Sequence, residues 1–256
     1  MLKILKYDLK KIEVHPIKLS LFILMPIILT SCIVFISHMH EIDDKPAEGE
    51  FASNLLLFIL RISTSYFFLP AWIIITTGFE FKNGHISRII PLLGRVFYLK
   101  SKLIHSVLIA LLFTIVACIS YIISFWISEF NYSYYNLNWQ VLTQFFVVFL
   151  SYSLLLTFLI IVIKYPWQAF GWFIGIRLIE NFLSILLTKL LKLQFSPLPL
   201  HLIDHLYSVE GDYPTYYNPF YNNDIIAPCA VILCLIIIGY ASFRYFLHND
   251  LPRLSE

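Results

Sequence analysis

The chain has 256 residues and a formal net charge of +2 at pH 7. Hydrophobic residues make up 59% of it and charged residues only 13%, against about 25% in soluble proteins. This composition excludes a soluble fold, because a soluble domain of this length cannot bury so much apolar surface. We therefore expect an all-α membrane protein, with residues 1–256 forming a single transmembrane domain.

Residues 1–16 are predicted to form a helix that lies on the membrane surface. Within residues 2–14 apolar and basic side chains fall on opposite faces of a helix, and Pro16 then ends the pattern. The apolar face consists of Leu2, Leu5, Leu9 and Ile12, and the polar face of Lys3, Lys6, Lys10 and Glu13. A basic amphipathic helix of this kind binds in the headgroup layer. A basic tail that only sets the membrane topology is the alternative interpretation.

Six apolar windows are long enough to cross a bilayer core of about 30 Å, which takes roughly 20 helical residues. They are residues 19–37, 54–77, 103–127, 139–163, 167–187 and 225–243. We therefore predict six transmembrane helices, with a kink permitted at Pro70 in the second. The first window is too long for a cleavable signal peptide and lacks a cleavage pattern. The four cysteines lie inside these windows without metal-ligand spacing, so we interpret them as buried small apolar residues.

Lysine and arginine collect on one side of the predicted membrane. Eleven of them lie before the first span, between spans two and three, and between spans four and five. The other connections, residues 38–53, 128–138 and 193–224, are acidic and contain one lysine, Lys45; Lys189 and Lys192, at the outer end of span five, are the exception. Because basic loops stay in the cytoplasm, we expect a multi-pass protein of the cell membrane with both termini inside. Residues 193–224 then form an external segment, which is either re-entrant or interfacial, or else a plain amphipathic loop.

The polar segment 79–102 between spans two and three is predicted to be more than a connecting loop. From Glu80 to Ile90 charges alternate with an apolar stripe, and Pro91 ends the pattern. This spacing predicts a short amphipathic helix that continues span two into the cytoplasm. Such a helix can press its apolar edge and polar end into a groove of another protein. A plain basic loop is the alternative, but it would need neither Glu80 nor Gly84.

The order of residues in this segment resembles that of permease subunits of type-2 ABC exporters. A Glu leaves span two, a Gly follows four residues later, and a Pro, an Arg and a Lys lead to span three. The matching positions are Glu80, Gly84, Pro91, Arg95 and Lys102. The chain departs from the family at His85 and Gly94, where Thr and Ser are common. The resemblance implies that the segment is the coupling helix, which contacts an ATPase subunit through Glu80, Phe81, Gly84 and Arg88.

The resemblance also implies partners. The chain contains no GxxxxGK[ST] motif, so ATP and Mg²⁺ would be bound by a separate ATPase subunit and no cofactor by this chain. Two ATPase copies and a second permease copy, identical or paralogous, are implied. The chain looks most like small permeases of Gram-positive bacteria that export, or confer immunity to, lantibiotics and cytolytic peptides, among them the phenol-soluble modulin exporters. We therefore expect an amphipathic peptide cargo, contact with membrane lipid, and no nucleic acid.

Three charged residues fall inside the predicted spans. Arg61 lies in span two, and Arg177 and Glu180 share one face of span five. A charge at this depth costs about 2.5–3.5 kcal/mol on insertion scales, so such groups normally pair or face a wet cavity. An ion pair between Glu180 and either arginine would be the least costly arrangement. These residues either lock spans two and five together or line a translocation pathway with Tyr66 and Phe67.

A second hypothesis makes the chain an intramembrane metal-dependent enzyme. His201, Asp204 and His205 imitate an H-x-x-E-H zinc motif, with Asp in place of Glu. Two histidines four residues apart can bind one metal ion on a helix face. The sequence offers no evident third ligand, and two histidines at a membrane interface are the simpler interpretation. We therefore expect a non-catalytic transport subunit.

Overall fold

The computed structural model of the chain describes residues 60, 64–82, 86, 89–91, 94–127, 139–191 and 226–248. These residues are helical apart from short connections, and they contain no strand. The predicted all-α class is therefore confirmed for them. The surface helix 1–16, the first span, the acidic connections and segment 193–224 lie outside the described residues. So do six predicted site residues, namely Arg61, Gly84, Arg88, His201, Asp204 and His205.

The second predicted span is described as four consecutive helical pieces. They are the π-helix η1 (Thr64–Phe68), α4 (Leu69–Ile73), the π-helix η2 (Ile74–Gly78) and α5 (Phe79–Lys82). Pro70 follows η1 and has no amide hydrogen to donate, which weakens regular α-helical bonding at this point. Within η2, Thr76 Oγ1 donates to the Trp72 carbonyl oxygen at 2.9 Å, a local bond that bends helices. Pro70 and the bond from Thr76 thus account for two departures from a straight helix.

Four long helices make up most of the rest of the described chain. They are α7 (Arg95–Ile127), α8 (Trp139–Ile163), α9 (Pro166–Leu191) and α11 (Ile226–His248). The prediction of residues 139–163 is correct at both ends. In contrast, α7 begins at Arg95 and not at residue 103, because Gly94 adopts a φ of 80° and its carbonyl accepts the Tyr98 amide hydrogen at 3.1 Å. The basic residues before the apolar window are good helix formers, so they extend the helix.

Two of these helices have the length and apolar character needed to cross a membrane, over Arg95–Ile123 and Phe145–Ile163. A shorter apolar stretch covers Ile232–His248. Large apolar side chains also remain exposed along one face of α7, at Leu103, Val107, Leu111, Ile115, Ile119 and Ile122. Soluble monomers rarely leave so continuous an apolar surface open to water. The helices therefore indicate membrane association.

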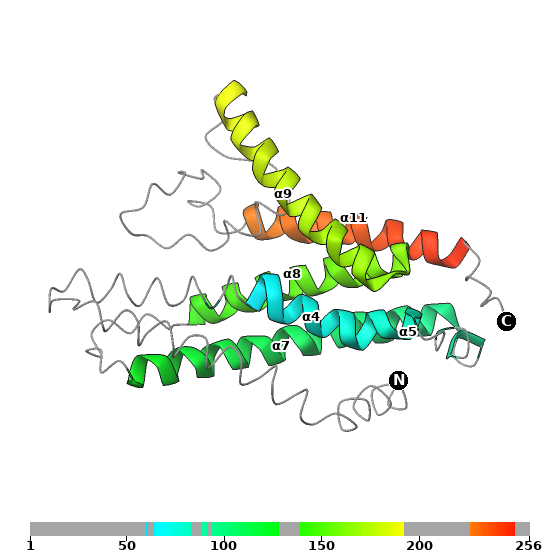
Figure 1. The fold of residues 1–256 in the computed structure, drawn as a ribbon, viewed down its shortest axis with the longest axis horizontal. Helices are drawn as coiled ribbons and strands as arrows, with labels where there is room; N and C mark the ends of the chain where they lie inside the picture. Colours follow the sequence, from blue (N-terminus) through cyan, green and yellow to red (C-terminus); the bar gives the residue numbers. More distant parts are fainter. Residues whose placement is uncertain are drawn as a thin grey trace, which may run out of the picture.

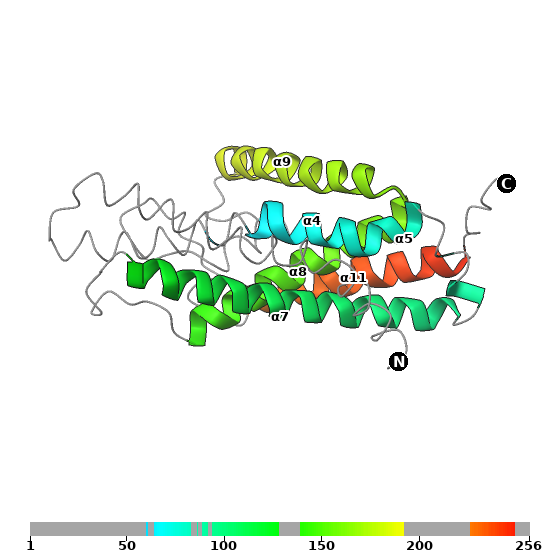
Figure 2. The same ribbon diagram turned by 60° about the horizontal axis from the view of Figure 1, so that its bottom comes forward.

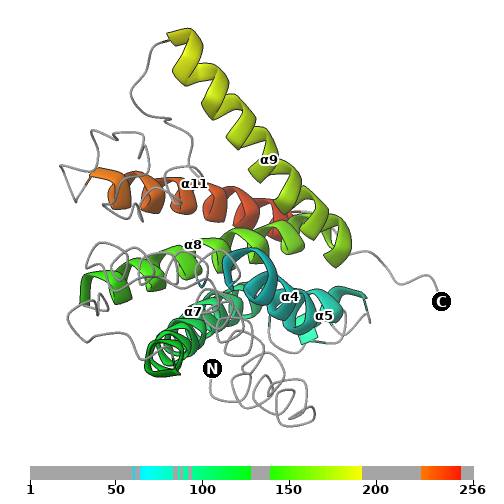
Figure 3. The same ribbon diagram turned by 60° about the vertical axis from the view of Figure 1, so that its left-hand side comes forward.

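Helix α8 lies at the centre of the described bundle and contacts α4, α7, α9 and α11. Figures 1 and 2 show α4, α5, α7, α8 and α11 running along a roughly common axis, with α5, the start of α7 and the end of α11 together at one end. Phe145, Phe149 and Tyr152 of α8 fill the core against Leu69 and Phe113. Helix α9 packs on this core near its start, and its later turns lead away from it (Figures 1 and 3).

Only two residues connect α8 with α9. Lys164 has a φ of 65°, in the left-handed region that non-glycine residues rarely adopt. Its amide donates to the Ile160 carbonyl oxygen at 2.8 Å, which ends α8 in the manner of a left-handed cap. Tyr165 follows, and its carbonyl oxygen accepts the Ala169 amide hydrogen at 2.9 Å. The chain therefore reverses direction sharply at the end of α8.

Span two and α9 approach each other closely at Gly78. A Cβ atom added at Gly78 would collide with the ring of Pro166, the first residue of α9. We expect Gly78→Ala to destabilise the protein by about 1–3 kcal/mol, because the two helices would have to move apart. The matched control is Gly171→Ala in α9, where nothing lies within 4 Å of the added Cβ. That change should stabilise the helix by about 0.5–1 kcal/mol. Thermal unfolding in detergent measures both, and equal effects would contradict the prediction.

Candidate functional site

Glu80 lies at the end of span two, and its side chain is buried in the protein. Its carboxylate accepts hydrogen bonds on both oxygens, from Lys102 Nζ at 2.8 Å and from the Tyr98 hydroxyl at 2.8 Å. The side chains of Lys102 and Glu80 are 2% and 1% exposed, so the ion pair is buried. We call Glu80, Tyr98 and Lys102 the Glu80 cluster. It joins α5 to the first turns of α7.

The local sequence explains why the two α7 residues of the cluster face Glu80 together. Tyr98 and Lys102 are four residues apart, so they lie on the same helix face. Aromatic neighbours hold the Tyr98 ring, with Phe246 of α11 stacked at a centroid distance of 6.0 Å and Phe81 edge-on at 6.4 Å. Phe81, predicted as a coupling residue, therefore packs beside the cluster.

Polar contacts continue from the Glu80 cluster between the helices. Ser106 and Thr157 share a hydrogen bond between α7 and α8 at 3.1 Å, and Ser153 donates to the Ser106 carbonyl oxygen at 3.3 Å. His105 Nε2 lies 3.2 Å from Thr76 Oγ1, which links α7 to span two. Hydroxyl and imidazole groups of this kind hold helices together in an apolar medium. The sequence pattern alone predicts no role for these residues.

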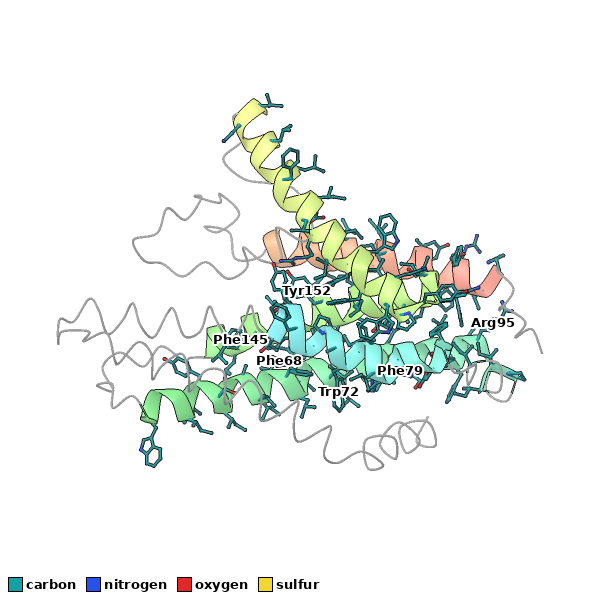
Figure 4. All side chains as sticks on the ribbon, viewed as in Figure 1. Phe68, Trp72, Phe79, Arg95, Phe145 and Tyr152 are labelled. Carbon is teal, nitrogen blue, oxygen red and sulfur yellow. The ribbon has the colours of Figure 1, made fainter. Side chains whose placement is uncertain are left out.

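Arg95 ties the start of α7 to the end of α11. Its Nη1 donates to the carbonyl oxygens of Phe246 at 3.2 Å and Leu247 at 2.8 Å. The last carbonyls of a helix lack partners within it, and a cation is favoured there by the helix dipole. Figure 4 shows Arg95 at the end of the bundle where α11 finishes. The arginine therefore holds the last described helix against segment 79–102.

The apolar stripe predicted in segment 79–102 faces the chain's own helices. Ile86 and Ile90 are buried and pack in one cluster with Tyr98, Leu99 and Ile161. The apolar edge that we expected to enter a partner's groove is thus covered within this chain. The described isoleucines of the segment thus pack on the start of α7 and the end of α8, whereas Pro91 and Gly94 are exposed.

A second polar site surrounds Arg177 of α9. The side chain is 3% exposed, and its guanidinium carbon lies 4.4 Å from the ring centroid of Tyr66 and 4.6 Å from that of Tyr152. The guanidinium also donates to the Tyr66 hydroxyl. The structure thus brings together Arg177 and Tyr66, two predicted pathway residues, and adds Tyr152 from α8. Figure 4 labels Tyr152. A buried cation between two aromatic faces is held by their π electrons.

The other predicted pathway residues lie differently. Phe67 is 66% exposed, so it does not line the site around Arg177. Glu180 is half-buried on the next turn of α9. The ion pair between Glu180 and Arg61 stays a prediction, because Arg61 lies outside the described residues.

Span two carries hydroxyl groups that find no hydrogen-bond partner among the described atoms. They are the buried side-chain oxygens of Thr64 and Ser65 in η1 and of Thr77 in η2. A buried hydroxyl without a partner costs about 1–3 kcal/mol. All three lie in π-helical pieces, which concentrate at functional sites. A rearrangement of span two, or water entering beside it, would regain this free energy.

No metal site is formed by the part of the chain that the structure describes, where no three His, Cys, Asp or Glu residues gather closely enough. The chain matches no protein-family model, and no curated protein or solved structure matches it either.

Proposed function

We propose that the chain is the membrane-spanning permease subunit of an ATP-driven exporter, with six spans and cytoplasmic termini. The Glu80 cluster is the observation that carries the proposal. It places a buried ion pair where span two meets segment 79–102, the segment that resembles a coupling helix. An ion pair inside a membrane protein is costly unless both partners are engaged, and here both carboxylate oxygens are. A loop that only sets topology would not require it.

The contacts around the Glu80 cluster could transmit a movement of segment 79–102 to the helices. Two ATPase chains that close on ATP would displace segment 79–102. Because Glu80 is bonded to Lys102 and Tyr98, this displacement would move α5 and α7 together. Arg95 would carry α11 with them through its bonds to the last carbonyls. The two π-helical pieces give span two positions where it can change its helical register.

The site around Arg177 is our candidate for the wall of the pathway. It joins span two to α9 by Tyr66 and Arg177, so a shift of span two would alter it. Aromatic rings and few fixed charges suit an amphipathic peptide better than a sugar or an inorganic ion. A second permease copy would complete the pathway. The exposed apolar residues of α9 support such a contact, at Leu178, Ile179, Phe182, Leu183, Leu186 and Leu190.

Purification of the tagged chain from its own membranes tests the proposal. We expect an ATP hydrolase with a Walker A motif to co-purify, and its hydrolysis rate to change when the permease is present. Arg88→Glu, a charge reversal in the predicted coupling helix, should abolish this association. Lys189→Glu, at the other end of the predicted membrane, should leave it intact. Retention of the ATPase by the Arg88 variant, or the lack of any such partner, would refute the proposal.

A further inference from the structure

An apolar groove opens on the outside of the bundle between α7, α8 and α11. It encloses about 380 Å³, within the range of roughly 300–1,000 Å³ typical of ligand pockets. The three helices lie side by side (Figure 2). The floor is buried and includes Leu99, Phe158 and Ile161. The rim is exposed at Leu103, Ile232, Ile236 and Tyr240, so the groove faces outward from the described helices.

The walls of the groove favour a hydrocarbon guest. Two of its few polar residues are already engaged, Lys102 with Glu80 at 2.8 Å and Thr157 with Ser106 at 3.1 Å. At Gly239 an added Cβ would lie 2.9 Å from Phe158 Cζ, so the backbone of α11 closes directly on the floor. A polar ligand would lose its hydration here and gain few hydrogen bonds in return. An acyl chain carries no such cost.

A positive charge beside the groove favours a lipid with an anionic headgroup. Arg244 lies one turn beyond Tyr240 on α11 and is exposed, with its guanidinium carbon 6.0 Å from the Tyr240 ring centroid. Glu80 and Glu180 are the only acidic residues in the described part of the chain, and neither lines the groove. Arg244 lies toward the end of α11 that meets Arg95, which is the cytoplasmic end in the proposed topology. Anionic lipids collect in that leaflet and attract basic residues.

We propose that this groove binds one acyl chain of an anionic phospholipid from the inner leaflet, with the lipid phosphate against Arg244. The proposal rests on the membrane orientation given under the proposed function but does not depend on export. A lipid molecule would then be a specific ligand bound between α7, α8 and α11, and not only part of the solvent around the protein.

Native mass spectrometry of the full chain, purified with equal amounts of phosphatidylglycerol and phosphatidylcholine, tests the proposal. We expect a single phosphatidylglycerol to be retained in preference to phosphatidylcholine. Ile236→Trp should fill the groove and abolish retention. Ile237→Trp is the matched control, because the two residues are adjacent and 60% and 59% exposed, but only Ile236 lines the groove. Equal retention by the two variants would identify adventitious lipid and overturn the proposal.

Arg244→Gln tests the headgroup separately. We expect its preference for phosphatidylglycerol to fall about fivefold, the effect of removing one cation beside an anionic surface. Lys189→Gln, an exposed change on α9, should leave the preference unchanged. Two results would refute an anionic lipid as the occupant. One is equal binding of both lipids by the unchanged protein, and the other is that Ile236→Trp disrupts a dimer while lipid stays bound. The assay contains neither ATP nor an ATPase, so a failure of the export proposal would not affect its result.

Discussion

Lys102→Met is expected to destabilise the protein by about 3–5 kcal/mol, because it leaves the buried Glu80 carboxylate without its cation. Unfolding in mixed micelles, titrated with SDS, measures the free energy. The double variant Glu80→Gln/Lys102→Met should recover most of the loss, since no charge then remains buried. Lys100→Met, an exposed change on the same helix, should stay within about 0.5 kcal/mol of the unchanged protein. Equal destabilisation at the two lysines would show that the ion pair does not stabilise the fold.

The same double variant separates stability from coupling. If the chain has the proposed export function, this variant should insert and fold but lose the link between ATP hydrolysis and export, because the charged contact between α5 and α7 is gone. Glu80→Ala should likewise insert without supporting export. The measurement is cargo export per ATP hydrolysed in vesicles that contain the partner ATPase. Full export by a stably folded Glu80 variant would rule out the coupling role.

Arg177→Lys is expected to be the second most damaging of these changes, although it preserves the charge. A planar guanidinium can lie against the rings of Tyr66 and Tyr152 and donate to the Tyr66 hydroxyl, whereas a lysine ammonium cannot reproduce this geometry. Removing a cation–π interaction that is shielded from water costs on the order of 2 kcal/mol. SDS titration again measures the decrease in unfolding free energy.

The control for Arg177 is an arginine–tyrosine contact at the surface. Arg244 is exposed, and its guanidinium carbon lies 6.0 Å from the Tyr240 ring centroid. Arg244→Lys should cost less than about 1 kcal/mol, because water screens the contact. Similar destabilisation at both positions would mean that burial between the rings does not set the strength of the Arg177 contact.

The sequence predicts which segments are helical better than it predicts where the helices end or which residues contact one another. The bounds of α8 follow from one uninterrupted apolar window, which Lys164 ends. The predicted start of α7 is too late, because hydropathy detects the membrane-crossing part of a helix and not its polar continuation. Gly94 is the residue that indicates this earlier start, because glycine readily adopts the positive φ seen there, just before the basic residues that begin the helix.

The candidate site is predictable only in part, for a physical reason. Glu80 and Arg177 stand out because charges are rare in this chain, and the cost of burying them implies partners. Tyr98 and Tyr152 carry no such signal, because aromatic residues make up 17% of the sequence and most of them simply pack. The π-helical pieces are not predicted either. Pro70 indicates a bend, but the bond from Thr76 to the Trp72 carbonyl depends on a side-chain rotamer.

Only Lys164 and Tyr165 separate α9 from the end of α8. A tilt of α9 at this connection would move the helix as one unit, because two residues leave little chain in which to dissipate it. Its 26 residues, at about 1.5 Å per residue, give a lever arm of about 39 Å. A tilt of about 10° at Lys164 would therefore sweep the far tip of α9 through about 7 Å. A small angular change at the α8–α9 connection would thus be magnified at the far end of α9.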